Sequence, residues 1–434
     1  MRFSSSPNRP EGWKEMKLAD ICKTFTSGGT PSRKKLEYFE HGTIPWVRTK
    51  ELNDGVITEV EEFITPEALK NSSAKMLPKN TVLLAMYGAT VGKLGVLGFE
   101  SSCNQACAAM VPKDGVVDYR FLYYLLLNHR ELIISQATGG AQQNLSGELI
   151  KGFTFDFPTY KEQEAIADVL WTIDEKIVIN NSLSKTLENV AQAIFKSWFI
   201  DFDPVKAKMS GEKPAGMDAA TAALFPDSME DSELGLMPQG WQARQLKSAL
   251  VLHKSTIKAG AATESVPYVP IDQIGSRDIF LKNSMSGSEA KTSLVSFERN
   301  DILFGAMRPY FHKVALAPFD GTTRTTTFVL RAINPRYLAF SLLTVFQDSA
   351  VGYATNHSQG TTIPYAVWNN SFENYPLVFP SETVATAFND SVLPLIEYGY
   401  SLVKENQKLV QLRDGLMPRL ISGELQIPDE MLAS

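Results

Sequence analysis

The chain contains the same order of short motifs twice, with a spacing of roughly 220 residues. Each copy opens on Gly-Trp, at Gly12 and Gly240, and closes on Phe-Pro, at Phe157 and Phe379. The matching segments between these ends are Ile44–Val47 with Val266–Val269, Asn80–Met86 with Asn300–Ala306, and Arg120–Leu122 with Arg336–Leu338. Solenoid repeats are only about 20–50 residues long, so a period of this length indicates two duplicated domains.

Within each copy, short apolar runs alternate with Gly, Pro, Asn and Ser, which is typical of strands joined by turns. Residues 82–86 and 301–307 read as strands, and residues 91–99 read as the return strand of a hairpin. Residues 119–133 and 335–347 read as helices that begin at a turn. This mixture predicts an α+β fold for each copy.

A long helix with an apolar seam is expected after each Phe-Pro. The seam residues recur every seven positions, at Ile166, Ile173, Asn180, Leu187 and Ile194, and again at Phe388, Leu395, Leu402, Leu409 and Leu416. Such heptads predict two helices, each of about 39 residues, that pack on each other as an antiparallel coiled coil. Val190 is expected beside the seam, Asn180 is expected to fix the register, and Pro394 is expected to kink or delay the second helix. Two core helices buried separately are the alternative.

These patterns divide the chain into six segments: a first domain at 1–158, a helix at 159–200, a connector at 201–239, a second domain at 240–380, a helix at 381–425 and a tail at 426–434.

The net charge of −6 hides an uneven distribution. Lys and Arg outnumber Asp and Glu by 18 to 17 in residues 1–158 and by 13 to 9 in residues 240–380. The acidic residues are in excess only in the connecting segments. Two neutral-to-basic domains joined by acidic connectors can bind a polyanion such as DNA, although acidic helices can also be simple solvated surfaces.

Composition favours a cytoplasmic protein. No apolar run is long enough for a membrane span, and the N-terminus lacks the apolar core of a secretory signal. Cys22, Cys103 and Cys107 are an odd, sparse set without metal-ligand spacing, which favours reduced thiols and no metal site.

No catalytic constellation is expected. The segment Gly88–Leu94 resembles a phosphate-binding loop, but it is one residue short and has Leu94 in place of Ser or Thr. Asn334–Tyr337 resembles a methyltransferase Asn-Pro-Pro-Tyr loop with Arg336 in place of the second proline. Asp201 and Asp203 form a carboxylate pair without a nearby lysine at nuclease spacing.

Polar turns at strand ends remain as candidates for base and phosphate contacts. Arg is the commonest reader of guanine, Asn and Gln pair with adenine, and Lys and Thr contact phosphates more often. The candidates in the first copy are Thr30, Ser32, Arg33, Lys34, Lys35, Arg48, Lys50, Tyr87, Lys93, Gln142, Gln143 and Asn144. The candidates in the second copy are Arg277, Arg308, Tyr310, His312, Lys313, His357, Gln359, Thr361 and Thr362. A solvated surface loop is the alternative for each single residue.

Nearly the whole chain resembles the specificity subunits of type I restriction–modification systems. The segments that carry the resemblance are residues 27–52, 83–97, 104–108, 137–153, 160–177, 197–241 and 412–425. The second copy departs most in residues 360–380. This segment has four more residues between its apolar anchor and Phe379 than the first copy has before Phe157.

The resemblance implies that the two domains are target-recognition domains, each reading one half of a split, asymmetric site in double-stranded DNA. It also implies that the helices hold the domains apart and dock two modification subunits, which methylate adenine with S-adenosylmethionine. Restriction subunits would add translocation and cleavage driven by ATP and Mg²⁺, so that this chain itself needs no cofactor. Two rivals are a fused enzyme, for which methyltransferase motifs are missing, and a coiled-coil scaffold or decoy that reads no sequence.

Overall fold

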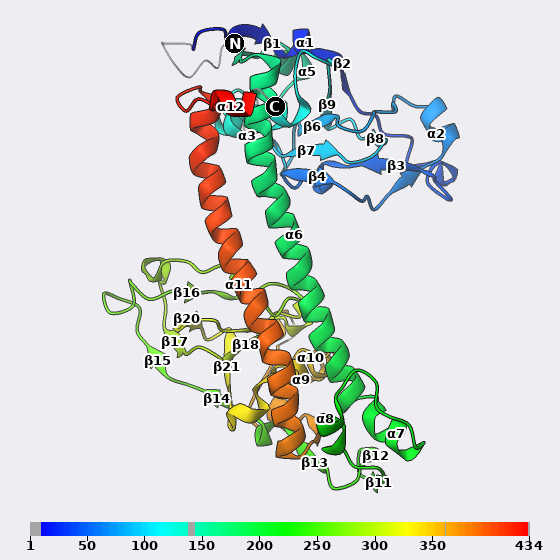
Figure 1. The fold of residues 1–434 in the computed structure, drawn as a ribbon, viewed down its shortest axis with the longest axis vertical. Coiled ribbons are helices and arrows are strands. Elements are labelled where there is room, and N and C mark those ends of the chain that lie inside the picture. The colour runs from blue at the N-terminus through cyan, green and yellow to red at the C-terminus, as the bar shows by residue number, and fades with distance from the viewer. Residues whose placement is uncertain (1–9, 138–143, 361, 433–434) are drawn as a thin grey trace. The chain divides into compact units, whose positions relative to one another are not determined.

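The computed structural model describes residues 10–137, 144–360 and 362–432. The chain folds into two compact units, Met1–Ile177 with Lys408–Ser434, and Val178–Gln407. Each unit contains one β-rich domain and a part of each of two long helices (Figure 1). Both helices are thus shared between the units, whereas the sequence pattern assigned them to segments of their own. The segment boundaries predicted above stay a prediction.

The first domain is built from two sheets and a two-stranded ribbon. The larger sheet has the order β2 (Cys22–Ser27), β9 (Cys107–Pro112), β6 (Val82–Ala85), β7 (Leu94–Leu97) and β4 (Gly55–Ile57). The smaller sheet has the order β5 (Phe63–Ile64), β3 (Ile44–Val47) and β8 (Ser102–Cys103), and the ribbon pairs β1 (Lys14–Lys17) with β10 (Thr154–Phe157). The helices of this domain are α1 (Leu18–Ile21), α2 (Pro66–Lys70), α3 (Tyr119–Asn128), α4 (Arg130–Ser135) and α5 (Gly147–Lys151).

Local chemistry explains where α3 begins. The carboxylate of Asp118 accepts hydrogen bonds from the backbone N–H groups of Arg120 at 2.8 Å and Phe121 at 3.1 Å. These bonds satisfy donors that the first helical turn leaves unpaired. Residues 121–126, which follow, are all buried, so α3 packs into the domain core.

The second domain repeats this plan. Its first sheet has the order β14 (Leu250–His253), β21 (Thr327–Ala332), β18 (Ile302–Gly305) and β19 (Val314–Leu316). Its second sheet has the order β15 (Thr256–Ile257), β17 (Leu294–Phe297), β20 (Gly321–Arg324) and β16 (Tyr268–Val269), and the ribbon pairs β13 (Gln242–Gln245) with β22 (Pro376–Phe379). Two helices, α9 (Leu338–Val345) and α10 (Asp348–Asn356), follow β21.

Strand registers show that the two domains are structural copies. Val82 faces Met110 in the first domain, and the equivalent Ile302 faces Leu330 in the second. The parallel pairing of β3 with β8 also recurs, between β16 and β20. The predicted α+β fold with duplicated domains is confirmed.

The long helices α6 (Tyr160–Phe199) and α11 (Glu382–Ile421) pack together in antiparallel orientation. In the first unit, the guanidinium of Arg413 bonds to Asp174 at 2.7 Å. In the second unit, the amide of Asn180 donates to Glu405 at 2.8 Å and to Asn406 at 2.9 Å. Further along α6 in the same unit, the ring of Phe195 lies 6.0 Å from the ring of Phe388, so later residues of α6 face earlier residues of α11, which confirms the predicted antiparallel coiled coil. Asn180 is nearly fully buried, as the heptad pattern required.

Two parts of the helix prediction do not hold: the delay at Pro394 and the place of Val190 beside the seam. Helix α11 begins at Glu382, well before Pro394, so this proline does not delay it. Val190 is 41% exposed, whereas Ser184 and Glu188 are buried. The reason is that Glu188 accepts a hydrogen bond from the backbone N–H of Ile279 at 3.1 Å, which turns this face of α6 toward the β-rich domain.

The connector is ordered rather than loose. It contains α7 (Asp203–Met209), α8 (Ala219–Ala223) and a hairpin of β11 (Met229–Ser232) and β12 (Gly235–Pro238). Phe225 is buried, and its ring lies 5.0 Å from the ring of Trp198. The tail carries α12 (Asp429–Leu432) and buries Ile427 in the core of the first unit.

Candidate nucleic-acid interface

The loop before β3 carries the first group of candidate residues, and its cations have partners within the domain. Arg33 pairs with Glu62 at 2.7 Å, and its guanidinium lies over the rings of Phe39 at 4.4 Å and Trp46 at 5.0 Å. The hydroxyl of Thr30 donates to Gln105. Arg33 is therefore held on an aromatic surface in a fixed direction.

Arg48 and Lys50 pair with the same acidic turn. Arg48 contacts Glu62 and lies 3.2 Å from Glu61, which also accepts a hydrogen bond from Lys50. The hydrogen bond from Lys50 keeps the pKa of the exposed Glu61 below its usual value. We name Arg33, Arg48, Lys50, Glu61 and Glu62 the cation–glutamate cluster. A DNA phosphate at this cluster would have to compete with two carboxylates.

Two neighbouring lysines are less engaged. Among the residues that the structure describes, Lys34 forms no ion pair, and Ser32 and Lys34 are both exposed. Lys35 donates to the Tyr38 hydroxyl at 3.1 Å, and this hydrogen bond raises the pKa of the Lys35 ammonium. Both ammonium groups remain at the surface and can reach a phosphate.

The loop between β6 and β7 carries Tyr87 and Lys93. Lys93 pairs with Asp54 at 2.7 Å, and Arg130 binds the same carboxylate. Burial tends to raise the pKa of Asp54, but the hydrogen bonds from Lys93, Leu94 and Arg130 outweigh it and lower the pKa. Lys93 thus helps to fix the loop between β6 and β7 to Asp54.

Only part of the amide-rich segment can be located. Asn144 is exposed and forms a backbone bridge with Tyr87, whereas Gln142 and Gln143 lie outside the described residues.

The equivalent loop of the second domain, Met307–Lys313 between β18 and β19, brings Arg308, Tyr310, His312 and Lys313 together. His312 is only 3% exposed, and its ring packs 4.8 Å from the ring of Phe346. The ammonium of Lys313 donates to the carbonyls of Ile271 at 3.0 Å and Ile274 at 2.7 Å. These contacts favour structural roles for His312 and Lys313, while Arg308 and Tyr310 remain accessible.

Arg277 lies beside this loop and is tied to it through Asp348. The carboxylate of Asp348 pairs with Arg277 at 2.8 Å and lies 3.2 Å from Nδ1 of His312. Burial and then the charge of Arg277 lower the pKa of His312, so the imidazole is neutral near pH 7. The neutral ring is a packing group here.

A further group of candidates follows α10. The ring of His357 stacks on Tyr353 at 4.0 Å, and its Nδ1 lies 2.8 Å from the Tyr353 carbonyl oxygen. Gln359 pairs with Tyr365 through both backbone groups, and its side chain is exposed. Thr362 is exposed as well, whereas Thr361 lies outside the described residues.

Sequence reasoning missed four residues that contribute to these loops. Phe311 is as exposed as Tyr310 and lies against its ring at 4.9 Å. Glu61 and Glu62 hold the first-domain cations, and Asp348 holds Arg277. The adjacency of Tyr310 and Phe311 was visible in the sequence. The ion pairs join residues that are distant along the chain and carry no local signal.

The segments that resembled enzyme motifs have other roles. The loop Gly88–Gly92 leads into strand β7, whereas a phosphate-binding loop leads into a helix N-terminus. Asn334 caps a helical turn through Arg336 N at 3.0 Å. Within the described residues, no group of three or more His, Cys, Asp or Glu is arranged to hold a metal, and no helix is long and apolar enough to cross a membrane.

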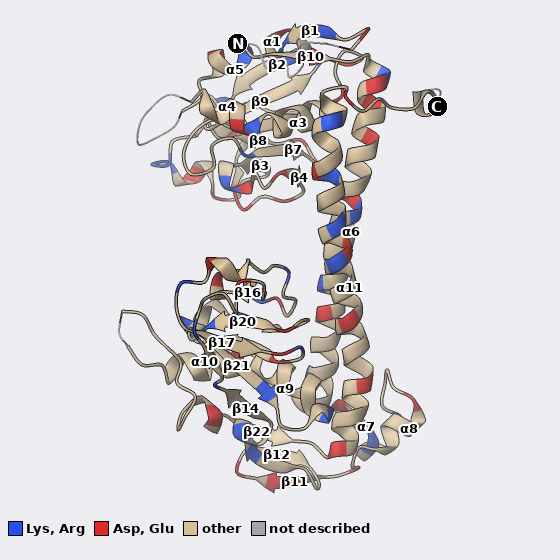
Figure 2. Ribbon diagram, turned by 90° about the vertical axis from the view of Figure 1, so that its left-hand side faces the viewer, with Lys and Arg blue, Asp and Glu red and all other residues tan. Residues whose placement is uncertain are grey.

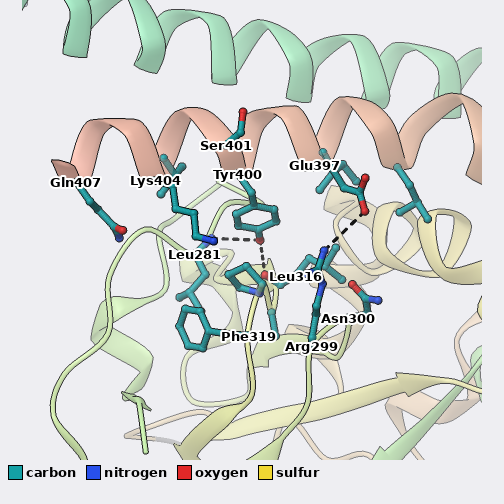
Figure 3. Close-up of a pocket in the computed structure, with 15 residues that line it drawn as sticks. Leu281, Arg299, Asn300, Leu316, Phe319, Glu397, Tyr400, Ser401, Lys404 and Gln407 are labelled. Carbon is teal, nitrogen blue, oxygen red and sulfur yellow. Dashed lines mark hydrogen bonds and ion pairs between the residues drawn. The ribbon is translucent and has the colours of Figure 1, made fainter. Parts of the chain in front are cut away.

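Helix α11 anchors the second domain through Tyr400, which points toward Leu316 (Figure 3). Its hydroxyl donates to the Leu316 carbonyl, lies 3.2 Å from the Ile279 carbonyl, and accepts from Leu281 N at 3.4 Å. Burial raises the pKa of this phenol well above its usual value. A pocket of about 340 Å³ lies beside it, where Arg299 faces Glu397 at 3.7 Å.

Comparisons with known proteins agree with this arrangement. Residues 10–189 match the family model described as the type I restriction modification DNA specificity domain. The MjaIX specificity subunit of Methanocaldococcus jannaschii is 27% identical over 97% of this chain and 95% of its own length. The HindI specificity subunit of Haemophilus influenzae is 21% identical over 95% of this chain and 99% of its own length. A solved S subunit from M. genitalium shares the fold, with a TM-score of 0.55 at 16% identity over 96% of this chain and 98% of that chain.

The first β-rich domain matches a DNA-specificity domain, the second repeats its fold, and each is followed by a long helix, which together define a DNA-recognition protein. The chain belongs to the specificity (S) subunits of type I restriction–modification systems. It is the non-catalytic recognition subunit of such a system.

Proposed function

We propose that each β-rich domain of this S subunit reads one half of a split, asymmetric site in double-stranded DNA. The observation that carries the proposal is the duplication itself, since two copies of one fold carry different side chains on the same loops. The loop after β6 bears Tyr87, Gly88 and Thr90 at the positions where the loop after β18 bears Met307, Arg308 and Tyr310. Two domains with one scaffold and different loops are suited to two different half-sites.

The partner subunits belong to the same proposal. Two modification subunits, docked on α6 and α11, methylate adenine with S-adenosylmethionine, and restriction subunits use ATP and Mg²⁺. The complex works on DNA in the cytoplasm. Figure 2 shows both signs of charge along the two helices, whose exposed side chains would face such partners.

The test is to map methylated adenines in the genome of a host that carries the complete system. We expect one split motif with two unlike halves and an unread gap of fixed length. The purified chain alone should neither methylate nor cleave DNA, and methyl transfer should appear only after a modification subunit is added. Methyl transfer by the isolated chain would show that it is an enzyme. Methylation without a shared motif would support the rival view of a scaffold that reads no sequence.

A further inference from the structure

The loop between β18 and β19 is held rigidly from both ends. Arg308 N donates to the Pro364 carbonyl at 2.8 Å, and His312 N donates to the Pro309 carbonyl at 2.8 Å. The Ser276 hydroxyl donates to the Phe311 carbonyl at 2.6 Å. With the His312 ring buried as well, the loop has one backbone conformation and loses little entropy when it binds a ligand.

This loop adopts a backbone that its residues disfavour. Arg308 has φ 51° and His312 has φ 52°, both in the left-handed region. The equivalent positions of the first domain are Gly88 at φ 84° and Gly92 at φ 82°, where glycine adopts the same region without strain. The second domain thus keeps the loop shape and accepts strain in order to place side chains there. Non-glycine residues in this region cluster at functional sites.

Arg308, Tyr310 and Phe311 differ from His312 and Lys313 of the same loop, whose side chains make structural contacts. Among the described residues, the guanidinium of Arg308 has no ion pair or hydrogen bond. Tyr310 is 50% exposed and Phe311 is 48% exposed. In the first domain, a Cβ at Gly88 would meet no atom within 4 Å, so the equivalent position of the fold opens to solvent. A guanidinium without a partner among the described residues, on the same loop as two exposed aromatic rings, can pair with a base edge while the rings exclude water from that pair.

We propose that Arg308 reads a guanine in the major groove of the half-site bound by the second domain, with Tyr310 and Phe311 packed around the contact. The proposal rests on the proposed function and names its specificity-determining residue. A guanidinium donates two parallel hydrogen bonds, which match the O6 and N7 acceptors of guanine. Lysine is a point charge and does not reproduce this fork.

The test uses the assembled complex of the S chain with its modification subunits and a duplex carrying its mapped site. Arg308→Gly removes the side chain but suits the left-handed backbone, so the fold is preserved and the melting temperature should stay equal or rise. Arg308→Lys keeps the charge. Arg299→Ala is the matched control, because it removes one cation of the same domain whose partner is Glu397 on α11. Binding is measured on the mapped site, on every single base-pair change of the second half-site, and on random DNA.

We expect the wild-type complex to lose about tenfold to a hundredfold in affinity when one guanine is replaced, or when it is exchanged for 7-deazaguanine, which lacks the N7 acceptor. Arg308→Gly should weaken binding to the mapped site by a similar factor and should no longer distinguish guanine from 7-deazaguanine there. Arg308→Lys should lose most of this discrimination, and Arg299→Ala should keep all of it. Replacing Tyr310 and Phe311 together with serine should reduce the discrimination at the same base pair.

Equal loss for Arg308→Gly on the mapped site and on random DNA would make Arg308 a phosphate contact and overturn the proposal. An unchanged affinity would overturn it as well. A wild-type complex that distinguishes no sequence at all would instead refute the proposed function.

Discussion

At the scale of single residues, the packing of the second domain against α11 depends on a close contact between Gly399 and Phe280. The ring of Phe280 packs 5.2 Å from the ring of Tyr400, directly against Gly399. A Cβ at Gly399 would overlap the Phe280 ring, which is buried and would have to shift. A helical glycine costs stability on its own, so its use here reflects the need for this contact.

Gly399→Ala is therefore expected to destabilise the protein by about 1–3 kcal/mol, as overpacking of a filled core does. Gly415→Ala on the same helix is the control, since a Cβ there meets no atom within 4 Å. That change should stabilise by up to about 1 kcal/mol through helix propensity. Thermal unfolding of the two variants measures both effects. Equal melting temperatures would show that the Phe280 contact has little energetic weight.

At the scale of elements, the helix pair is fixed by polar contacts inside an apolar interface. In the first unit, the carboxylate of Asp174 accepts from Tyr124 at 2.6 Å and from Arg413 at 2.7 Å, which joins α3, α6 and α11. Burial, followed by the charge of Asp174, raises the pKa of the Tyr124 phenol above its usual value. The Tyr124 side chain is fully buried, so its hydroxyl depends on this one carboxylate.

Asp174→Ala should cost about 1–3 kcal/mol, because it leaves the buried Tyr124 hydroxyl without its partner and removes one of the two carboxylates that pair with Arg413. Asp168→Ala is the matched control, since Asp168 also lies on α6 and pairs with Arg120 of α3, but its side chain is 60% exposed. An exposed ion pair contributes only about 0–1 kcal/mol. Chemical unfolding of both variants gives the comparison. A loss as large for Asp168→Ala would mean that burial does not separate the two contacts.

At the scale of the whole molecule, the duplication determines the architecture of both β-rich domains. It was also the feature that the sequence revealed most directly. Runs such as Val82–Ala85 and Ile302–Gly305 recur in the same position and form equivalent strands with the same register. The heptads located both long helices. The heptad pattern placed Val190 beside the seam wrongly, because Glu188 accepts a hydrogen bond from Ile279 of the second domain. A repeat of apolar residues along one helix does not indicate such a contact.

The candidate site was less predictable than the fold. Sequence reasoning placed candidate residues on exposed loops, but it could not separate Arg308, which is free, from Arg33, which is paired with Glu62. It also grouped His312 with Tyr310, although one side chain is buried and the other is exposed. Both failures have one cause, since burial and ion pairing depend on residues that lie far apart in the chain.

Exchange of residues 12–158 for the equivalent domain of a homologous S subunit should change one half of the methylated motif and leave the other half intact. Base contacts at well-separated positions contribute independently, so the second domain should read as before. Genome-wide mapping of methylated adenine in a host with the hybrid subunit checks this. A hybrid that alters both halves would show that the domains do not act separately.

The ribbon at the base of each domain has an evolutionary consequence. Strand β1 pairs with β10, and Lys14 lies opposite Phe157, while β13 pairs with β22, and Gln242 lies opposite Phe379. The chain therefore enters and leaves each domain at the same place. Two crossovers between related genes, one at each strand of a ribbon, would transplant an entire domain without altering the length of any helix. Recombination of this kind would give a cell an S subunit with one new DNA specificity in a single event.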